Sequence, residues 1–306
     1  MSRFSKTVIV LLLLFAATYY WLMVNAGPTK APPRTIDIAQ VRKAADALAG
    51  KKPVALEYAV VATRQVPGAA LAAGTGLRKI TTGVIVWHVQ TARGGIVIDS
   101  GLTQADAKRL DFETYNKRAE SLVGQWMDGA DLIVFTHEHI DHVGGFLDHP
   151  RFKDIAASAV LSPGLVQGMT ALWRENAGLL PTPRKLAPIE PVAPGVVVIQ
   201  TPGHTPASQM IYVRLQNGRE YLFAGDTASL AANVIRKTPR SRLLTDWMVR
   251  EDRRATLGWI KGLDALHAQD QSIVIIPSHD TDWIAATAQS DGFTLAPALI
   301  PAQKRK

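Results

Sequence analysis

The chain has 306 residues, of which 47% are hydrophobic and 20% are charged, proportions typical of a globular protein with a substantial core. It contains no cysteine, which excludes disulfides and thiolate metal sites, so any metal would be held by imidazole and carboxylate groups. The formal charge is +8, but the basic residues are scattered rather than gathered in a tract, and we expect no nucleic-acid partner.

The N-terminus carries an apolar segment of the length that crosses a bilayer. Residues 7–26 contain no charged side chain, and a helix of this length, at about 1.5 Å of rise per residue, spans the hydrocarbon core. Arg3 and Lys6 lie in the short tail 1–6 and favour a cytoplasmic N-terminus. We therefore expect a transmembrane anchor with the rest of the chain in the periplasm. The alternative is a signal peptide cleaved near Ala26, which would give a secreted protein.

The region after this segment divides into a linker, one large domain and a tail. Residues 27–36 are rich in proline, which disfavours a helix and predicts a short, stiff tether. Residues 37–300 are expected to form a single domain, and residues 301–306 a basic tail.

The elements predicted between residues 37 and 300 alternate short apolar strands with helices. In chain order, they are a helix over 37–50, strands over 54–62, 81–89 and 94–101, a helix over 165–176, a hairpin over 210–226 and a helix over 251–269. The turn of the hairpin is predicted at Asn217-Gly218, a pair that accepts the positive φ of a tight turn. The basic segment 236–254 is interpreted as a mostly helical, solvated face, with a patch that steers anionic ligands as the alternative.

Four of the apolar runs end at short polar loops that carry side chains able to bind a metal. A buried strand fixes where its end lies, and the loop beyond it can aim side chains into a cleft. The candidate ligands after these runs are, in chain order, His137, His139, Asp141 and His142, then His204, then Asp226, and finally His279. If the four strand ends meet, these imidazoles and carboxylates would suffice for two divalent ions.

The segment THEHIDH, residues 136–142, carries the strongest signal. Its ligand-type side chains would repel one another and lose hydration if they were buried without a cation, so we expect a metal site here. Glu138 and Ile140 alternate with the ligands and are expected to point away from the ions. The histidines without comparable surroundings are interpreted as structural or surface residues: His88, His149 and His267.

At these residues the chain resembles the metallo-β-lactamase superfamily, whose signature is His-x-His-x-Asp-His. The segment FTHEHIDHVGG carries the motif between an apolar strand and two glycines, and TPGHTPAS, FAGDT and IPSHD look like the later metal-binding loops. The resemblance implies an α/β fold, the αββα sandwich, in which two mixed sheets pack face to face with helices outside and the site at one edge.

The resemblance also implies a role for each candidate residue. The first metal would be bound by His137, His139 and His204, the second by Asp141, His142 and His279, and Asp226 would bridge both. Asp99, in the segment IVIDSG, is expected to brace the metal loop rather than to bind metal.

Asp226 and Ser229 narrow the reaction that the resemblance implies. β-Lactamases of this superfamily generally have cysteine or serine where this chain has Asp226, whereas the glyoxalase II, homoserine-lactone lactonase and phosphodiesterase branches keep the aspartate. The segments GHTPAS and SHD look more like the lactonase and glyoxalase II branches. The best-known lactonases often place a tyrosine where this chain has Ser229, so a phenol at that position does not polarise the substrate carbonyl here.

The expected activity is metal-dependent hydrolysis of a small-molecule lactone, ester or thioester, with a homoserine-lactone-type substrate favoured. The imidazole and carboxylate ligands favour zinc but also suit manganese or iron. Two such divalent ions would supply an activated hydroxide, and Asp141 would pass a proton to the leaving group. The substrate-facing walls are expected from residues 62–76 and 163–190. The sequence does not indicate an oligomeric state.

Three alternatives to this activity stay open. The first is phosphodiester hydrolysis, which the basic segment 236–254 encourages. The second is β-lactam hydrolysis, which a periplasmic location suits but Asp226 does not. The third is a non-catalytic surface protein that metal stabilises and that binds partners.

Overall fold

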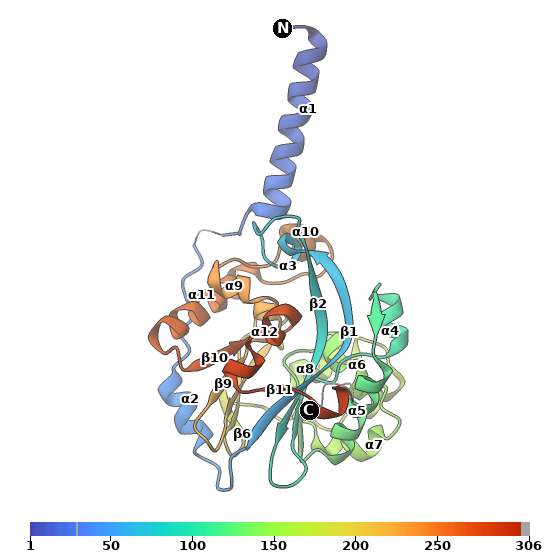
Figure 1. Ribbon diagram of the computed structural model, residues 1–306, viewed down its shortest axis with the longest axis vertical. Helices are drawn as coiled ribbons and strands as arrows, with labels where there is room; N and C mark the ends of the chain where they lie inside the picture. The colour runs from blue at the N-terminus through green and yellow to red at the C-terminus, as the bar shows by residue number, and fades with distance from the viewer. Residues whose placement is uncertain (29, 301–306) are drawn as a thin grey trace.

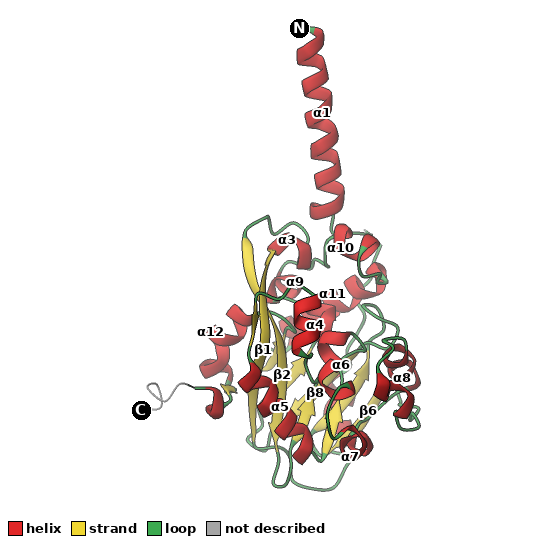
Figure 2. Cartoon of the chain, turned by 90° about the vertical axis from the view of Figure 1, so that its right-hand side faces the viewer, coloured by secondary structure: helices red, strands yellow, loops and turns green. Residues whose placement is uncertain are grey.

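Two β-sheets pack face to face, and helices cover the outer face of each sheet (Figure 1, Figure 2). This computed structural model describes residues 1–28 and 30–300, so the predicted basic tail 301–306 lies outside the described residues. One sheet has the strand order β11-β1-β2-β3-β5, with β4 paired to β1, and the other has the order β10-β9-β8-β7-β6. Both sheets are mixed, because each combines parallel and antiparallel pairs.

The bounds of the elements are as follows. The strands are β1 (Ala55–Pro67), β2 (Lys79–Gln90), β3 (Ile96–Ile98), β4 (Thr114–Tyr115), β5 (Leu132–Val134), β6 (Ile189–Ala193), β7 (Val196–Gln200), β8 (Gln209–Arg214), β9 (Glu220–Phe223), β10 (Ile273–Ile276) and β11 (Thr294–Leu295). The α-helices are α1 (Arg3–Tyr19), α2 (Ile38–Ala45), α3 (Gly68–Leu71), α4 (Gln104–Arg109), α5 (Lys117–Gly129), α6 (Ile140–Leu147), α7 (Phe152–Ile155), α8 (Pro163–Thr170), α9 (Ala231–Ile235), α10 (Arg242–Trp247), α11 (Arg253–Gln269) and α12 (Thr281–Asp291). Shorter helical turns are η1 (Tyr20–Val24), which continues α1, η2 (Ala156–Ser158), η3 (Glu175–Leu179), η4 (Gly225–Ala228) and η5 (Pro297–Leu299).

Separate hydrophobic clusters hold the layers together. Successive side chains of a strand point to opposite faces of its sheet, so β8 sends Ile211 into the cluster between the sheets and Tyr212 into the cluster beneath α2 and α11. The outer face of the other sheet packs against α5 and α6, where Val123 and Phe146 are buried. This layering confirms the predicted α/β sandwich with two mixed sheets.

The N-terminal helix stands away from the domain (Figure 1). The span Arg3–Val24 has a mean hydropathy of 2.2, is only 6% buried, and is long and apolar enough to cross a membrane. The last turn of the helix, η1, contacts the domain and packs against α3 and α10. The anchor therefore stays a prediction of length and composition.

The linker after the helix is packed on the domain rather than free of it. The backbone N–H of Arg34 donates to the carbonyl oxygen of Gly258 at 2.9 Å, and Nζ of Lys261 donates to that of Ala31 at 2.8 Å. A Cβ on Gly262 would lie 2.0 Å from the carbonyl oxygen of Arg34, so glycine is what allows this close approach. Proline composition predicted a stiff segment but not its docking on α11.

The predicted elements agree with the structure apart from their ends. The 210–226 hairpin is formed by β8 and β9, and Gly218 in its turn has φ +87°. The helix predicted over 37–50 ends at Ala45, and the one predicted over 165–176 ends at Thr170. Trp173, three residues later, has φ +54°, a value that no α-helix accommodates.

Candidate metal centre

Four strand ends deliver the predicted ligands to one edge of the sandwich. The loop after β5 carries His137 and His139, and α6 begins at the next residue, so Asp141 and His142 lie in its first turn. The loops after β7, β9 and β10 carry the remaining three ligands. All seven predicted side chains are brought together in two groups, each with its donor atoms within 4.8 Å of one another.

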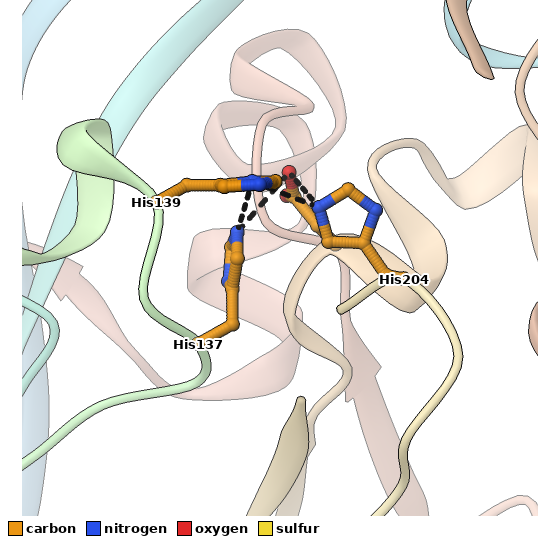
Figure 3. Close-up of side chains that lie close together, drawn as sticks. His137, His139 and His204 are labelled. Carbon is orange, nitrogen blue, oxygen red and sulfur yellow. Dashed lines mark hydrogen bonds and ion pairs between the residues drawn. The ribbon is translucent and has the colours of Figure 1, made fainter. Parts of the chain in front are cut away.

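The first group consists of His137, His139, His204 and Asp226. Figure 3 shows the three imidazole rings turned toward one another. Nδ1 of His139 lies 3.0 Å from Nε2 of His137 and 3.0 Å from Nε2 of His204. Oδ2 of Asp226 lies 3.7 Å and 3.5 Å from the same two Nε2 atoms. The grouping is the one that the resemblance implies for the first metal.

The second group consists of Asp141, His142 and His279. Oδ2 of Asp141 lies 3.8 Å from Nε2 of His142 and 3.7 Å from Nε2 of His279. Oδ1 of Asp226 lies 3.7 Å and 2.8 Å from these two nitrogens. One oxygen of Asp226 thus faces each group, as a bridging carboxylate requires.

These donors fit a pair of divalent metal ions. Nε2 of His142 is buried without a hydrogen-bond partner among the described residues, although it faces two carboxylates. Burial, with His142 nearby, holds the pKa of His137 well below its usual value, and burial, with the Arg240 guanidinium, does the same for His204. Neutral imidazoles have the free lone pair that a metal ligand needs. Ligation itself stays a prediction.

The second group lies in a strongly negative environment. Burial lowers the pKa of His142, but the carboxylates of Asp99, Asp141 and Asp226 outweigh burial and raise this pKa to about 10. Carboxylates that retain a proton on an imidazole also attract a cation to the same place. The local charge therefore favours occupation by a divalent ion.

Asp99 touches the metal loop as a brace would. Its Oδ1 accepts the backbone N–H of Thr136 at 2.7 Å, and its Oδ2 lies 2.9 Å from both Oγ1 of Thr136 and Nδ1 of His142. The hydrogen bond to Nδ1 leaves Nε2 of His142 free to face the site. A Cβ on Gly145 would lie 2.2 Å from the carbonyl oxygen of Ser100, so the motif's second glycine lets α6 approach the segment after Asp99.

Glu251 orients another ligand and was not predicted from the sequence. Its Oε2 lies 3.1 Å from Nδ1 of His204, and both side chains are fully buried. Burial raises the pKa of Glu251 to about 7, against the opposing charges of Arg240 and Arg253. A carboxylate behind a ligating histidine fixes the ring and its tautomer. Nothing in the local sequence around residue 251 indicated this partner.

Arg240 corrects the interpretation of the basic segment 236–254. This arginine is only 6% exposed, its Nε donates to Oγ of Ser229 at 2.9 Å, and its Nη2 contacts a carboxylate oxygen of Asp226. Arg253 is also buried, and it donates to the carbonyl oxygen of Arg240. The segment is thus not a solvated face at these two residues, because Arg240 pairs with Asp226 and Arg253 donates to oxygens inside the domain. Ser229, whose role the sequence left open, positions the guanidinium.

The remaining predicted side chains lie largely as expected. Glu138 points away from the ligands, as expected, and accepts a hydrogen bond from Thr205 at 2.7 Å. Ile140 was expected to point away as well, but it lines the cleft beside the ligands. His88 is structural: its Nδ1 lies 2.8 Å from Oε1 of Glu57, and its ring stacks on Trp126. His149 and His267 lie outside both groups of candidate ligands.

A cleft of about 260 Å³ opens over the two groups, close to the lower end of the roughly 300–1,000 Å³ typical of small-molecule sites. Four candidate ligands, His139, Asp141, Asp226 and His279, lie at its floor. Its apolar walls are formed by Leu71, Leu110, Phe112, Ile140, Leu172, Leu244 and Val249. The predicted wall segments 62–76 and 163–190 contribute Arg64, Leu71 and Leu172, and the other wall residues come from segments that were not predicted.

Comparison with known proteins places this geometry in context. The family model of the metallo-beta-lactamase superfamily matches residues 80–279. A search of curated protein sequences found no match.

Several solved structures are similar in fold. One is an N-acyl homoserine lactone hydrolase with the product N-hexanoyl-L-homoserine bound at its catalytic metal centre, with a TM-score of 0.59, 19% identity, and coverage of 77% of this chain and 96% of that chain. A dizinc quorum-quenching lactonase has a TM-score of 0.53 and 15% identity, and the match covers 74% of this chain and 88% of that chain. A probable metal-dependent hydrolase from Staphylococcus aureus has a TM-score of 0.56 and 14% identity, and the match covers 76% of this chain and 91% of that chain. At these identities the likeness shows the fold alone.

Proposed function

Because the chain belongs to the metallo-β-lactamase superfamily, whose family model spans residues 80–279, we propose that this metallo-hydrolase opens lactones that carry an acyl chain. The observation that carries the proposal is the cleft. Its floor holds ligand side chains of both groups, and its walls are mainly apolar, so a carbonyl can reach the floor while an acyl chain lies against the walls. The retained carboxylate of Asp226 and the lactonases among the similar structures support the same choice.

We propose that the seven clustered side chains hold two zinc ions. Imidazole and carboxylate ligands suit zinc, although manganese and iron accept the same set. Bound divalent ions make water nucleophilic near neutral pH and polarise a carbonyl. The protein's own contribution is to orient the ligands, through Asp99 behind His142 and Glu251 behind His204.

Asp141 is the proposed proton carrier. It is the more exposed of the two candidate carboxylates, with 21% of its side chain accessible against 4% for Asp226, and it lines the cleft. A carboxylate at this position can receive a proton and deliver it to the departing alkoxide of an opened lactone.

Arg240 is the proposed substitute for the missing phenol. The side chain of Ser229, at the position where lactonases often have tyrosine, accepts hydrogen bonds from Arg240 and holds its guanidinium in the cleft lining. A fixed cation here can donate to the carbonyl oxygen of the substrate as negative charge develops on it.

The experiment that tests the substrate class compares three reactions. Purified full-length protein loaded with zinc is offered N-hexanoyl-homoserine lactone, bis-p-nitrophenyl phosphate and nitrocefin under the same conditions. The largest kcat/KM is expected for the lactone. Arg64 and Arg240 both line the cleft and would suit an anionic phosphodiester, so faster cleavage of the phosphodiester would replace the proposal by that second candidate.

The apolar N-terminal helix is proposed to anchor the catalytic domain at the periplasmic face of the membrane. The region around the alternative cleavage site is docked on the domain: the N–H of Gly74 donates to the carbonyl oxygen of Met23 at 2.9 Å, and Arg253 donates to that of Asn25 at 3.3 Å. These contacts favour an uncleaved helix. Retention of residues 1–26 in membrane-extracted protein, measured by mass spectrometry, supports this proposal, and a mature chain that begins near residue 27 would contradict it.

A further inference from the structure

Exposed apolar side chains lie on and beside the elements that contact the end of the N-terminal helix. We call this group of side chains the platform and define it by Leu77, Leu243, Trp247 and Met248. These side chains are 57%, 42%, 77% and 73% exposed. Leu77 lies in the loop after α3, Leu243 and Trp247 belong to α10, and Met248 follows α10 directly. Large apolar side chains gathered on a surface usually mark an interaction site.

The platform is continuous with the anchor. Both α3 and α10 contact η1, the last turn of the apolar helix, and both lie at its lower end in two views (Figure 1, Figure 2). The guanidinium of Arg242, at the start of α10, lies 4.3 Å from the ring centroid of Trp21 in η1. Tyr20 and Trp21 are themselves more than half exposed. A membrane that holds the helix would therefore meet the platform.

The charge of the platform suits lipid headgroups. The two segments that form it, 72–79 and 241–250, contain one acidic residue, Asp246, which pairs with Arg242 at 3.4 Å, and three further basic residues, Arg78, Lys79 and Arg250. Exposed tryptophan flanked by basic side chains is the composition that favours the interface between hydrocarbon and water. Basic residues near the surface are further attracted by anionic lipids.

The elements that carry the platform also form a wall of the cleft. Leu71 in α3 and Leu244 in α10 line the cleft, as does Val249 just after α10. Trp247 and Met248 lie between these last two residues in the sequence. The helix α10 thus has one side toward the cleft and another toward the exterior beside the anchor.

We propose that the platform lies in the headgroup layer of the glycerophospholipid bilayer that holds α1, and that the substrate is a long-chain amphiphile that enters the cleft from this bilayer past α3 and α10. This inference rests on the proposed hydrolase function and narrows its substrate class. A lactone with a long acyl chain concentrates in the membrane, and the apolar wall formed by Leu71, Leu244 and Val249 would receive that chain.

The position of the platform can be measured with labels. The chain has no native cysteine, so Met248→Cys accepts a single environment-sensitive fluorophore, and Trp173→Cys, at a side chain that is 92% exposed on another part of the domain, is the matched control. Full-length protein is reconstituted in nanodiscs of phosphatidylcholine with a minority of phosphatidylglycerol and a doxyl-labelled lipid. Strong quenching at residue 248 and none at residue 173 is expected. Quenching at residue 248 that is no stronger than at residue 173 would overturn the proposal. If neither residue were quenched, a protein partner would be the remaining occupant of the platform.

Substrate entry is tested by changing the platform and varying the acyl chain. The double variant W247E/M248E is compared with Leu179→Glu, a control at an exposed apolar residue outside the platform. In vesicles, the double variant is expected to lose about tenfold in kcat/KM for dodecanoyl-homoserine lactone, a change of about 1.4 kcal/mol, while the rate with water-soluble butanoyl-homoserine lactone and the metal content stay unchanged. Equal losses for both lactones, or no loss for either, would overturn the proposal. Failure of the proposed function would look different, because the wild-type protein would open neither lactone while residue 248 was still quenched.

Discussion

The brace at Asp99 allows one substitution to separate metal binding from folding. Asp99→Asn keeps the shape of the side chain and suits the left-handed backbone at this residue, where φ is +61°, because asparagine and aspartate both tolerate that conformation. The amide can still accept the N–H of Thr136, which lies 2.7 Å from Oδ1. It cannot reproduce the charged acceptor that lies 2.9 Å from Nδ1 of His142.

The expected loss follows from that single contact. With an amide behind Nδ1, the tautomer of His142 that leaves Nε2 free is no longer favoured, and such partners are typically worth about 10–100-fold in metal affinity, or about 1.4–2.7 kcal/mol. The loss should affect one of the two bound ions, because His142 belongs to the group with Asp141 and His279. Competition with a chromophoric chelator measures the affinity of the protein for each of the two zinc ions. Turnover of the variant at limiting zinc should fall as the more weakly bound ion is lost.

The chain offers a matched control for this substitution. Glu57 pairs with Nδ1 of His88 at 2.8 Å, a carboxylate–imidazole contact of nearly the same length that lies outside both groups of candidate ligands. Glu57→Gln should therefore lower thermal stability but leave zinc affinity unchanged. If Asp99→Asn bound both ions as tightly as the wild-type protein, or if Glu57→Gln weakened zinc equally, the reasoning about the brace would be wrong.

Further predictions concern single side chains. Asp226→Asn should bind zinc poorly and lose at least about a thousandfold in turnover, because it removes the charge shared by both groups; wild-type turnover at full purity would contradict this. Glu251→Gln should weaken zinc about 10–100-fold through His204, as chelator competition would show. Arg240→Met should keep two ions but lose about a hundredfold in kcat. An unchanged kcat would contradict the proposal that Arg240 donates to the carbonyl oxygen of the substrate. Asp270, whose pKa is lowered to about 2 by Ser272 and Arg42, stabilises the fold as a carboxylate, so Asp270→Asn should lower the melting temperature slightly at pH 7, and this difference should shrink as the pH falls below about 4 and through about 2.

The ligands could be predicted because their signal is local. The segment 136–142 concentrates donors just after an apolar strand. His204 and Asp226 each follow a strand that is buried on both faces, and His279 follows a strand that is partly buried. Such a strand is recognised from a few residues, and it fixes the position at which the following loop begins. The strand ends therefore predicted that the ligands could meet, and the resemblance carried by the motif implied the layered fold and the position of the centre at its edge.

Arg240 and Glu251 could not be predicted because their partners are distant in the sequence. Arg240 lies 14 residues beyond Asp226, and Glu251 lies 47 residues beyond His204. Both occur in a charged stretch whose composition resembles that of a solvated helix, and a buried ion pair leaves no periodic pattern. Similarly, proline in residues 27–36 predicted stiffness, whereas the docking of Arg34 on α11 depends on glycines in a helix more than 200 residues away.

The central claim is that the clustered histidines and aspartates hold two metal ions on which hydrolysis depends. The most direct measurement starts from full-length protein stripped by a chelator, adds zinc in known amounts, and follows both bound metal and the opening of N-hexanoyl-homoserine lactone. We predict no turnover without metal and a plateau at two equivalents of zinc per chain. Turnover that persists in the stripped protein, or a chain that binds no zinc, would contradict the claim.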